Sequence, residues 1–300
     1  MLLSWTERAR RGFAPGASAG LAIGRDYVGF AHLVAGRAAA LVETKLATPL
    51  FSDAPTPAAA SALDEALRQF PEKLRRRYLP VHVSLPDAAV NAATFELEQL
   101  PKTHAAQIDL VRLRFSRLGV SAAHLYACEP LERDGDKHLL FGMAGEASWQ
   151  KLVNEALARA RIVPWSVSAN ACRQFNRFHD RLTQASGALI VLAPDAWSLW
   201  LWDASGRPRF ARSRWRTSKE SHADIALEIE RLIVAYVHGD ASRGVERVHV
   251  LAGEETGAMA AALDARLREP CVPLSAEGGT AEAARGKASA DSSLAAALER

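Results

Sequence analysis

The sequence predicts a two-lobed α/β protein, because one order of elements (three strands, a helix and a strand) occurs twice. The first copy covers residues 19–85 and the second covers residues 187–251. The 300 residues suffice for two domains of ordinary size. Hydrophobic residues make up 49% of the chain and charged residues 24%, a balance that supports a sizeable core.

The first copy opens with a strand, a tight turn and a second strand. Residues 19–34 read AGLAIGRDYVGFAHLV, two apolar runs around a polar turn, and residues 38–48 supply a third strand-like run. Residues 51–60 are rich in Pro, Ala and small polar residues and predict a loop. A helix is predicted over residues 62–77, where apolar residues recur at helical spacing, and a buried strand over residues 81–85.

A small α+β insertion is predicted at residues 92–157 of the first lobe. Its elements are a strand over 89–97, a helix over 105–118, two strands over 123–131 and 137–144, and a helix over 147–160. A further helix is expected over residues 170–182. The predicted parts are therefore an N-terminal extension of residues 1–18, a first lobe of residues 19–182 and a second lobe of residues 183–300.

The second copy repeats this pattern with stronger apolar runs. It comprises a strand pair over 187–202, a strand over 207–215, an amphipathic helix over 223–237 and a strand over 245–251. A helix over 259–267, a short strand over 271–274, a loop over 278–293 and a last helical turn over 294–300 follow. Alternation predicts that Trp200 and Trp202 share one face of their strand, with Trp197 on the other.

Four segments resemble the PilM family of pilus-assembly proteins, to which the type II secretion L-type proteins and MshI proteins are related. They are AGLAIGRDYVGFAHL, VHVSLPDAAVNAATFELEQLPK, EIERLIVAY and RVHVLAGEETGAMAAALDARL. The resemblance, together with the repeated order, implies an actin-like ATPase (ribonuclease-H-like) fold. It further implies a cytoplasmic scaffold that binds the short cytosolic N-terminal tail of an inner-membrane assembly protein, in a groove between the first-lobe sheet and the insertion. Such a scaffold links the membrane complex to the assembly motor ATPase.

The resemblance places vestigial nucleotide loops at Gly24, Arg25, Asp26, Asp195 and Gly253. Phosphate transfer in this fold needs a magnesium-binding carboxylate at the end of the first strand, where this chain has an alanine at position 22. The turn that follows has no Ser or Thr, and Asp26 places a negative charge where phosphate would bind. Arg25 could offset that charge or grip a phosphate; otherwise it is an ordinary turn residue.

The other two nucleotide loops also depart from the family pattern. Before Asp195 the chain has Pro194, which offers no N–H, and Glu254 and Glu255 follow Gly253. Three altered loops predict a pseudo-ATPase that is not an enzyme and needs no cofactor. The alternative is an active ATPase that binds ATP and magnesium through Arg25, Asp195 and Gly253. A sugar kinase of the same fold is a third hypothesis, for which no catalytic Asp can be assigned.

Composition and cysteine use favour a cytoplasmic protein, and the resemblance implies that its partner holds it at the inner membrane. The three cysteines lie far apart and form no CxxC pair, and no apolar run is long enough to span a bilayer. Residues 1–11 form either a frayed extension or a short amphipathic helix for anionic lipid. The net charge of +3 gives no broad footprint for nucleic acid, no HExxH motif occurs, and Ser84 and Ser166 do not lie in a GxSxG elbow.

The densest basic segment, residues 207–219, allows two interpretations. Arg212, Arg214 and Arg216 alternate along a predicted strand and would share one face. They form either a solvated strand edge or a docking surface for an acidic partner or lipid headgroups, with Trp215 as an anchor.

Overall fold

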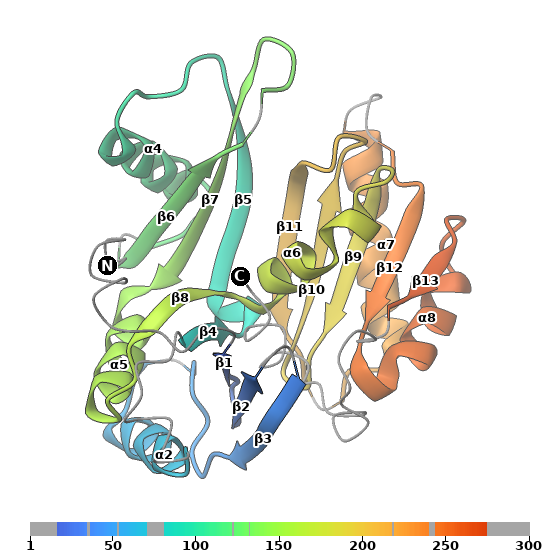
Figure 1. Ribbon diagram of the computed structural model, residues 1–300. Helices are drawn as coiled ribbons and strands as arrows, with labels where there is room; N and C mark the ends of the chain where they lie inside the picture. The colour runs from blue at the N-terminus through green and yellow to red at the C-terminus, as the bar shows by residue number, and fades with distance from the viewer. Residues whose placement is uncertain are drawn as a thin grey trace.

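The computed structural model describes residues 17–34, 37–52, 54–70, 81–121, 123–131, 133–217, 219–239 and 244–274. Figure 1 shows two lobes side by side, each built on a five-stranded sheet, with a three-stranded sheet rising from the first lobe beside the second. Most of residues 1–18, the C-terminal part of the predicted helix 62–77, the loop 278–293 and the helical turn 294–300 lie outside the described residues.

The two large sheets have the same strand order, which confirms the predicted repeat. In the first sheet the order is β3 (Arg37–Lys45), β2 (Tyr27–Val34), β1 (Ala17–Ile23), β4 (Val81–Leu85) and β8 (Pro164–Ala169). In the second it is β11 (Pro208–Trp215), β10 (Ala196–Trp202), β9 (Gly187–Leu192), β12 (Arg247–Leu251) and β13 (Cys271–Pro273). In each sheet the first three strands form an antiparallel meander, and the central strand then pairs in parallel with a later strand.

Helix α2 (Pro57–Arg68) begins five residues before the predicted start, inside the segment expected to be a loop. The Thr56 hydroxyl accepts a hydrogen bond from the backbone N–H of Ala59 at 3.1 Å, and Pro57 occupies the first helical position. Proline is tolerated there because that N–H has no helical partner. The capping residue and the proline therefore start a helix where composition alone suggested irregular chain.

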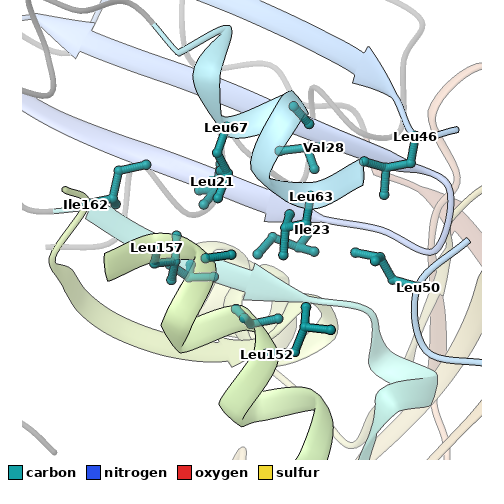
Figure 2. Packing of buried hydrophobic residues seen from close by; sticks show 14 of the residues in the cluster. Leu21, Ile23, Val28, Leu46, Leu50, Leu63, Leu67, Leu152, Leu157 and Ile162 are labelled. Atoms are coloured by element: carbon teal, nitrogen blue, oxygen red, sulfur yellow. The ribbon is translucent and has the colours of Figure 1, made fainter. Parts of the chain in front are cut away.

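The inserted sheet is a separate layer in the order β5 (Val90–Leu97), β7 (His138–Glu146) and β6 (His124–Pro130). Helix α4 (His104–Arg117) covers one face of this sheet through Val111 and Phe115. The prediction placed helix α5 (Ala147–Arg159) in the insertion 92–157, but the helix does not pack on the inserted sheet. Its apolar side, with Leu152 and Leu157, packs on the core of the first lobe (Figure 2).

The second lobe buries both faces of its central strands. Trp197 packs toward α7 (His222–His238) and α8 (Thr256–Asp264), while Trp200 and Trp202 pack toward α6 (Asn170–Leu182). The predicted alternation of the three tryptophans is confirmed, and all three side chains are buried. Among the described residues, every helix is too short or too polar to cross a bilayer.

The packing of α5 can be tested with Leu157→Ala. The side chain of Leu157 is fully buried in the first-lobe core, so its truncation leaves a cavity. We expect the free energy of unfolding to fall by about 2–5 kcal/mol, measured by urea denaturation. The control Val234→Ala, at an exposed site on α7, should stay within about 0.5 kcal/mol of the wild type. A loss no larger than the control's would mean that α5 is not part of this core.

Candidate functional site

The two turns that would flank a nucleotide are hydrogen-bonded directly to each other. The backbone N–H of Arg25, between β1 and β2, donates to the Asp195 carboxylate, between β9 and β10, at 2.5 Å. Its carbonyl accepts from the N–H of Leu50 at 2.6 Å. The backbone groups of Arg25 are therefore occupied by contacts within the protein, one of which crosses between the lobes.

Tyr27 covers the glycine of the first turn. A Cβ atom placed on Gly24 would lie 2.1 Å from the Tyr27 ring, so only glycine allows the ring to lie there. The N–H of Gly24 donates to the carbonyl of Tyr27 at 2.9 Å and closes the hairpin. Burial raises the pKa of Tyr27 well above its ordinary value, and the charges of Asp195 and Asp87 raise it further. The first turn thus has a neutral, buried aromatic ring packed against its glycine.

Asp195, a residue of the second turn, has a buried side chain. Burial raises the pKa of Asp195, while the hydrogen bond from the N–H of Arg25 opposes that shift. One carboxylate oxygen, Oδ2, accepts that bond, and the other, Oδ1, has no hydrogen-bond partner among the described residues. An unpaired carboxylate oxygen of this kind could accept a bound cation.

The predicted adenosine region is tied to Asp195 through Arg216. The backbone N–H of Arg216 donates to the Asp195 carbonyl at 2.8 Å, and its guanidinium binds both carboxylate oxygens of Glu255 at 2.9 and 2.8 Å. Glu255 also contacts His222 at 2.7 Å, and the hydrogen bonds from Arg216 hold the pKa of Glu255 below its usual range. Gly253, with φ of +55°, begins the short 3₁₀ turn that presents this glutamate.

Asp87 lies at the point where three segments converge. It is 3% exposed and accepts hydrogen bonds from the N–H of Ala171, in the first turn of α6, and from the Ser198 hydroxyl on β10, both at 2.6 Å. A carboxylate at a helix N-terminus is favoured by the unpaired N–H groups there. Burial nevertheless raises the pKa of Asp87 to about 6, the two hydrogen bonds oppose the shift, and the nearby charge of Asp195 adds to it.

Aromatic side chains of both lobes pack together at the same junction. Trp215, at the end of β11, packs against the first-lobe core, with the Arg25 guanidinium 5.6 Å from its ring centroid. Phe51 lies between Trp215 and Trp149, with ring centroids 6.2 and 5.2 Å away. Its φ of +55° is uncommon for a bulky side chain, so local strain accompanies this packing. Trp215 is thus an anchor within the molecule.

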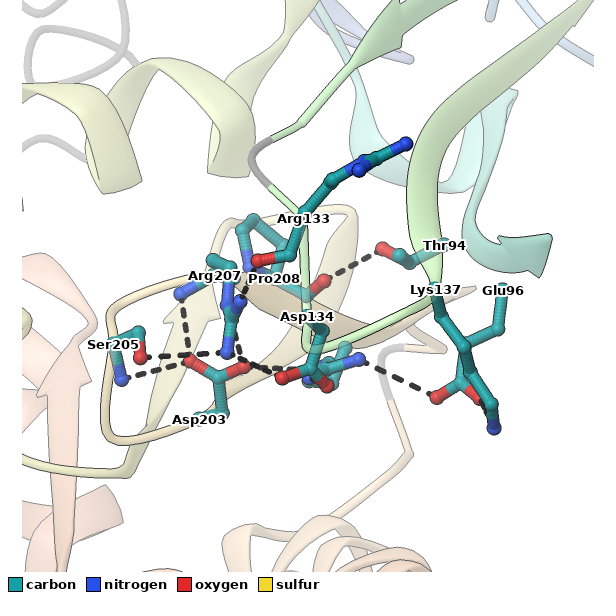
Figure 3. A network of polar contacts seen from close by, with 10 residues as sticks. Thr94, Glu96, Arg133, Asp134, Lys137, Asp203, Ser205, Arg207 and Pro208 are labelled. Carbon is teal, nitrogen blue, oxygen red and sulfur yellow. Dashed lines mark hydrogen bonds and ion pairs between the residues drawn. The ribbon is translucent and has the colours of Figure 1, made fainter. Parts of the chain in front are cut away.

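A second set of contacts joins the inserted sheet to β11, farther from the turns (Figure 3). Arg209 is bound by Asp203 at 2.7 Å, by Glu96 at 3.3 Å and by Asp134. Arg207 binds Asp203 and Asp134, each at 2.9 Å. We call these five residues the charged clamp. The Thr94 hydroxyl adds a hydrogen bond to the carbonyl of Pro208 at 2.7 Å.

The basic segment therefore acts mainly within the molecule. Strand β11 is the edge of its sheet, as the first interpretation expected. Arg214 binds Glu220 and Glu228 of its own lobe, and Arg212 is exposed. A polar cavity of about 490 Å³ opens beside the charged clamp, away from the two turns, and its wall includes Tyr236 and Glu246.

The structure brings Gly24, Arg25, Asp26 and Asp195 to one junction and connects Gly253 to it through Glu255 and Arg216. Asp26 is exposed at the rim, where its carbonyl accepts from the N–H of Leu46. Sequence reasoning missed Asp87, Tyr27 and Ser198. Asp87 had a usable signal, because it follows the buried strand β4 directly, at the carboxyl edge where ligand-binding residues of such sheets gather. In the part of the chain that the structure describes, no group of three or more acidic, His or Cys side chains could hold a metal ion.

Similarity to known proteins is found in the fold and not in the sequence. No family model matches the chain, and no curated protein matches it. A chain of the PilM–PilN type IV pilus biogenesis complex superposes with a TM-score of 0.73 at 15% identity, over 94% of this chain and 99% of that one. A Bacteroides thetaiotaomicron protein described as having an actin-like ATPase fold gives 0.58 at 11% identity, covering 98% and 99% of the two chains.

This chain has the actin-like fold. A third similar structure is the cytoplasmic domain of EpsL, an inner-membrane component of the type II secretion system of Vibrio cholerae, with a TM-score of 0.50 and 8% identity over 95% of this chain and 96% of that one. The predicted fold and the predicted structural resemblance to pilus and secretion assembly proteins are therefore confirmed. At these identities the likeness establishes the fold alone.

The titration of Asp87 predicts a pH-dependent stability. Its folded-state pKa is raised to about 6, so its contribution is fully present below the ordinary carboxyl pKa and is lost as pH rises through about 6. His82, whose pKa burial lowers to about 4, changes stability in the opposite direction over the same range. The difference between wild type and Asp87→Asn isolates the first effect. From pH 4 to 7 we expect the variant to gain up to about 3 kcal/mol relative to the wild type in urea unfolding. A difference that does not vary with pH would show that Asp87 keeps one protonation state.

Proposed function

We propose that this actin-like protein is a scaffold of a type IV pilus or type II secretion-like assembly machine, and that it does not hydrolyse ATP. The observation that carries the proposal is the direct bond between the Arg25 N–H and the Asp195 carboxylate, at the place where a nucleotide would separate the two turns. The similarity to a chain of the PilM–PilN complex supports the choice of machine. The scaffold would work in the cytoplasm, at the inner membrane through its partner, and would connect that partner to the assembly motor ATPase.

The residues of the junction do not fit ATP with magnesium. Ala22 stands at the end of β1 where the metal ligand is needed, and the Tyr27 ring covers Gly24. Pro194 has no N–H to offer to a phosphate in the second turn. Each of these features would remove a phosphate or metal contact that an actin-like ATPase requires.

The proposed docking site for the partner's cytosolic peptide is formed by two sheet edges. Strand β8 ends the order of the first sheet, and β6 ends that of the inserted sheet. Two apolar side chains near these edges are solvent-exposed, Val163 by 43% and Leu125 by 49%. An extended peptide can pair with a sheet edge through its backbone and place alternate side chains against such residues.

Peptide docking can be tested with the cytosolic tail of the membrane protein encoded beside this one. We expect Val163→Asp and Leu125→Asp to weaken binding of that synthetic peptide by at least about fivefold in calorimetric titration, because each places a charge in an apolar contact. Val234→Asp, an equally exposed site on α7, is the matched control. Binding that survives both edge variants would place the docking site elsewhere.

The absence of ATPase activity is tested by titrating ATP with magnesium and measuring phosphate release. We expect no turnover above buffer, because the phosphate-facing donors are occupied or missing. The competing hypothesis, an active ATPase with a non-standard pocket, is favoured by the unpartnered Oδ1 of Asp195. Turnover that disappears in Asp195→Ala would support that alternative and contradict the proposal.

A further inference from the structure

One end of helix α4 combines exposed leucines with arginines. Leu113 and Leu118 are 50% and 65% exposed, and they are two of the six large apolar side chains that stand out most from the described surface. Leu118 caps the helix, and Gly119, with φ of +82°, then turns the chain away. Val120, two residues later, packs against the small core of the inserted sheet and makes the apolar contact that ends the helix. The exposed Leu118 side chain therefore has no part in ending the helix.

The same segment carries a local excess of positive charge. Residues 101–120 contain Lys102, Arg112, Arg114 and Arg117 against a single carboxylate, Asp109, which gives a net charge of +3. Cations in the last turn suit the helix dipole, yet the dipole gives no reason for apolar side chains to be exposed beside them.

The helical geometry places Leu113 and Arg117 on one exposed face. Val111 and Phe115 point into the inserted sheet, while Leu113 and Arg117, four residues apart, lie on the opposite face and are both exposed. Arg112 stacks over Tyr126 at 5.6 Å and pairs with Asp109. Figure 1 shows α4 on the outer side of the inserted sheet, away from the second lobe. The C-terminal end of α4 therefore exposes two leucines, Leu113 and Leu118, close to the Arg117 guanidinium.

We propose that the C-terminal end of α4, with Leu113, Arg114, Arg117 and Leu118, binds an anionic membrane surface directly. Leucine side chains enter the boundary between headgroups and acyl chains, and long arginine side chains reach the phosphates from the same end of the helix. The exposed apolar groups are aliphatic, which suits lipid better than nucleic acid, whose bases stack on aromatic rings. The proposal is independent of peptide docking, which uses the strand edges.

The test is sedimentation of the full chain with vesicles of phosphatidylglycerol and phosphatidylcholine, compared with phosphatidylcholine alone. We expect binding to the anionic vesicles only, weakened by salt. Arg117→Glu should lower the partition coefficient at least about fivefold, since it removes a cation and adds an anion. Leu113→Ser with Leu118→Ser should lower it by a similar factor even at low salt. Thermal unfolding checks that each variant remains folded.

The matched control is the α7 pair Arg231→Glu and Val234→Ser, which has the same chemistry on an exposed face of the second lobe. It should bind like the wild type. A deletion of residues 2–11 tests the N-terminal segment as the lipid-binding element. The proposal is overturned if the α4 variants bind like the wild type, if the deletion alone abolishes binding, or if the full chain binds neither kind of vesicle.

Discussion

The arrangement of the two lobes depends on one buried carboxylate. Asp87 follows strand β4 of the first sheet, accepts a hydrogen bond from the start of α6 and accepts another from Ser198 on the second sheet. An isolated buried carboxylate is costly, so its ionised form is tolerated only while both donors are in place. The position of α6 and the approach of β10 are therefore coupled. Any movement that separates the lobes at this point takes the Ser198 hydroxyl away from the buried carboxylate.

Direct contacts between the lobes take the place that a ligand would have in an open cleft. At the turns, the Arg25 N–H meets Asp195, and Trp215 of the second lobe packs on the first-lobe core. Farther out, the ring centroid of Phe141 in the inserted sheet lies 5.5 Å from that of Trp200, and the charged clamp continues that contact to the start of β11. The interface thus combines buried apolar side chains with charge pairs. The Arg209 side chain, which takes part in these pairs, is only 10% exposed.

The sequence was sufficient to predict the repeated strand order, because buried strands appear as apolar runs and helices as a 3.6-residue pattern. It failed where the outcome depends on partners distant in the chain. The periodicity of α5 shows that the helix has an apolar face, but not that the face packs on α2 instead of the inserted sheet. The five candidate site residues were found through family resemblance. Asp87 and Ser198 are 111 residues apart, and only the folded sheets bring them together. The early start of α2 depended on one capping hydroxyl that composition concealed.

The charged clamp also determines how the inserted sheet can act. That sheet carries β6 on one side and α4 on its outer face, and it contacts β11 through β5. Because Asp134 and Glu96 of the insertion hold Arg209 of the second lobe, a displacement of the insertion must either carry β11 with it or break several charge-assisted hydrogen bonds at once. The edge β6 and the basic end of α4 are parts of the same small subdomain. Binding at either surface would therefore bias the position of the whole insertion, and the clamp would pass that bias to the second lobe.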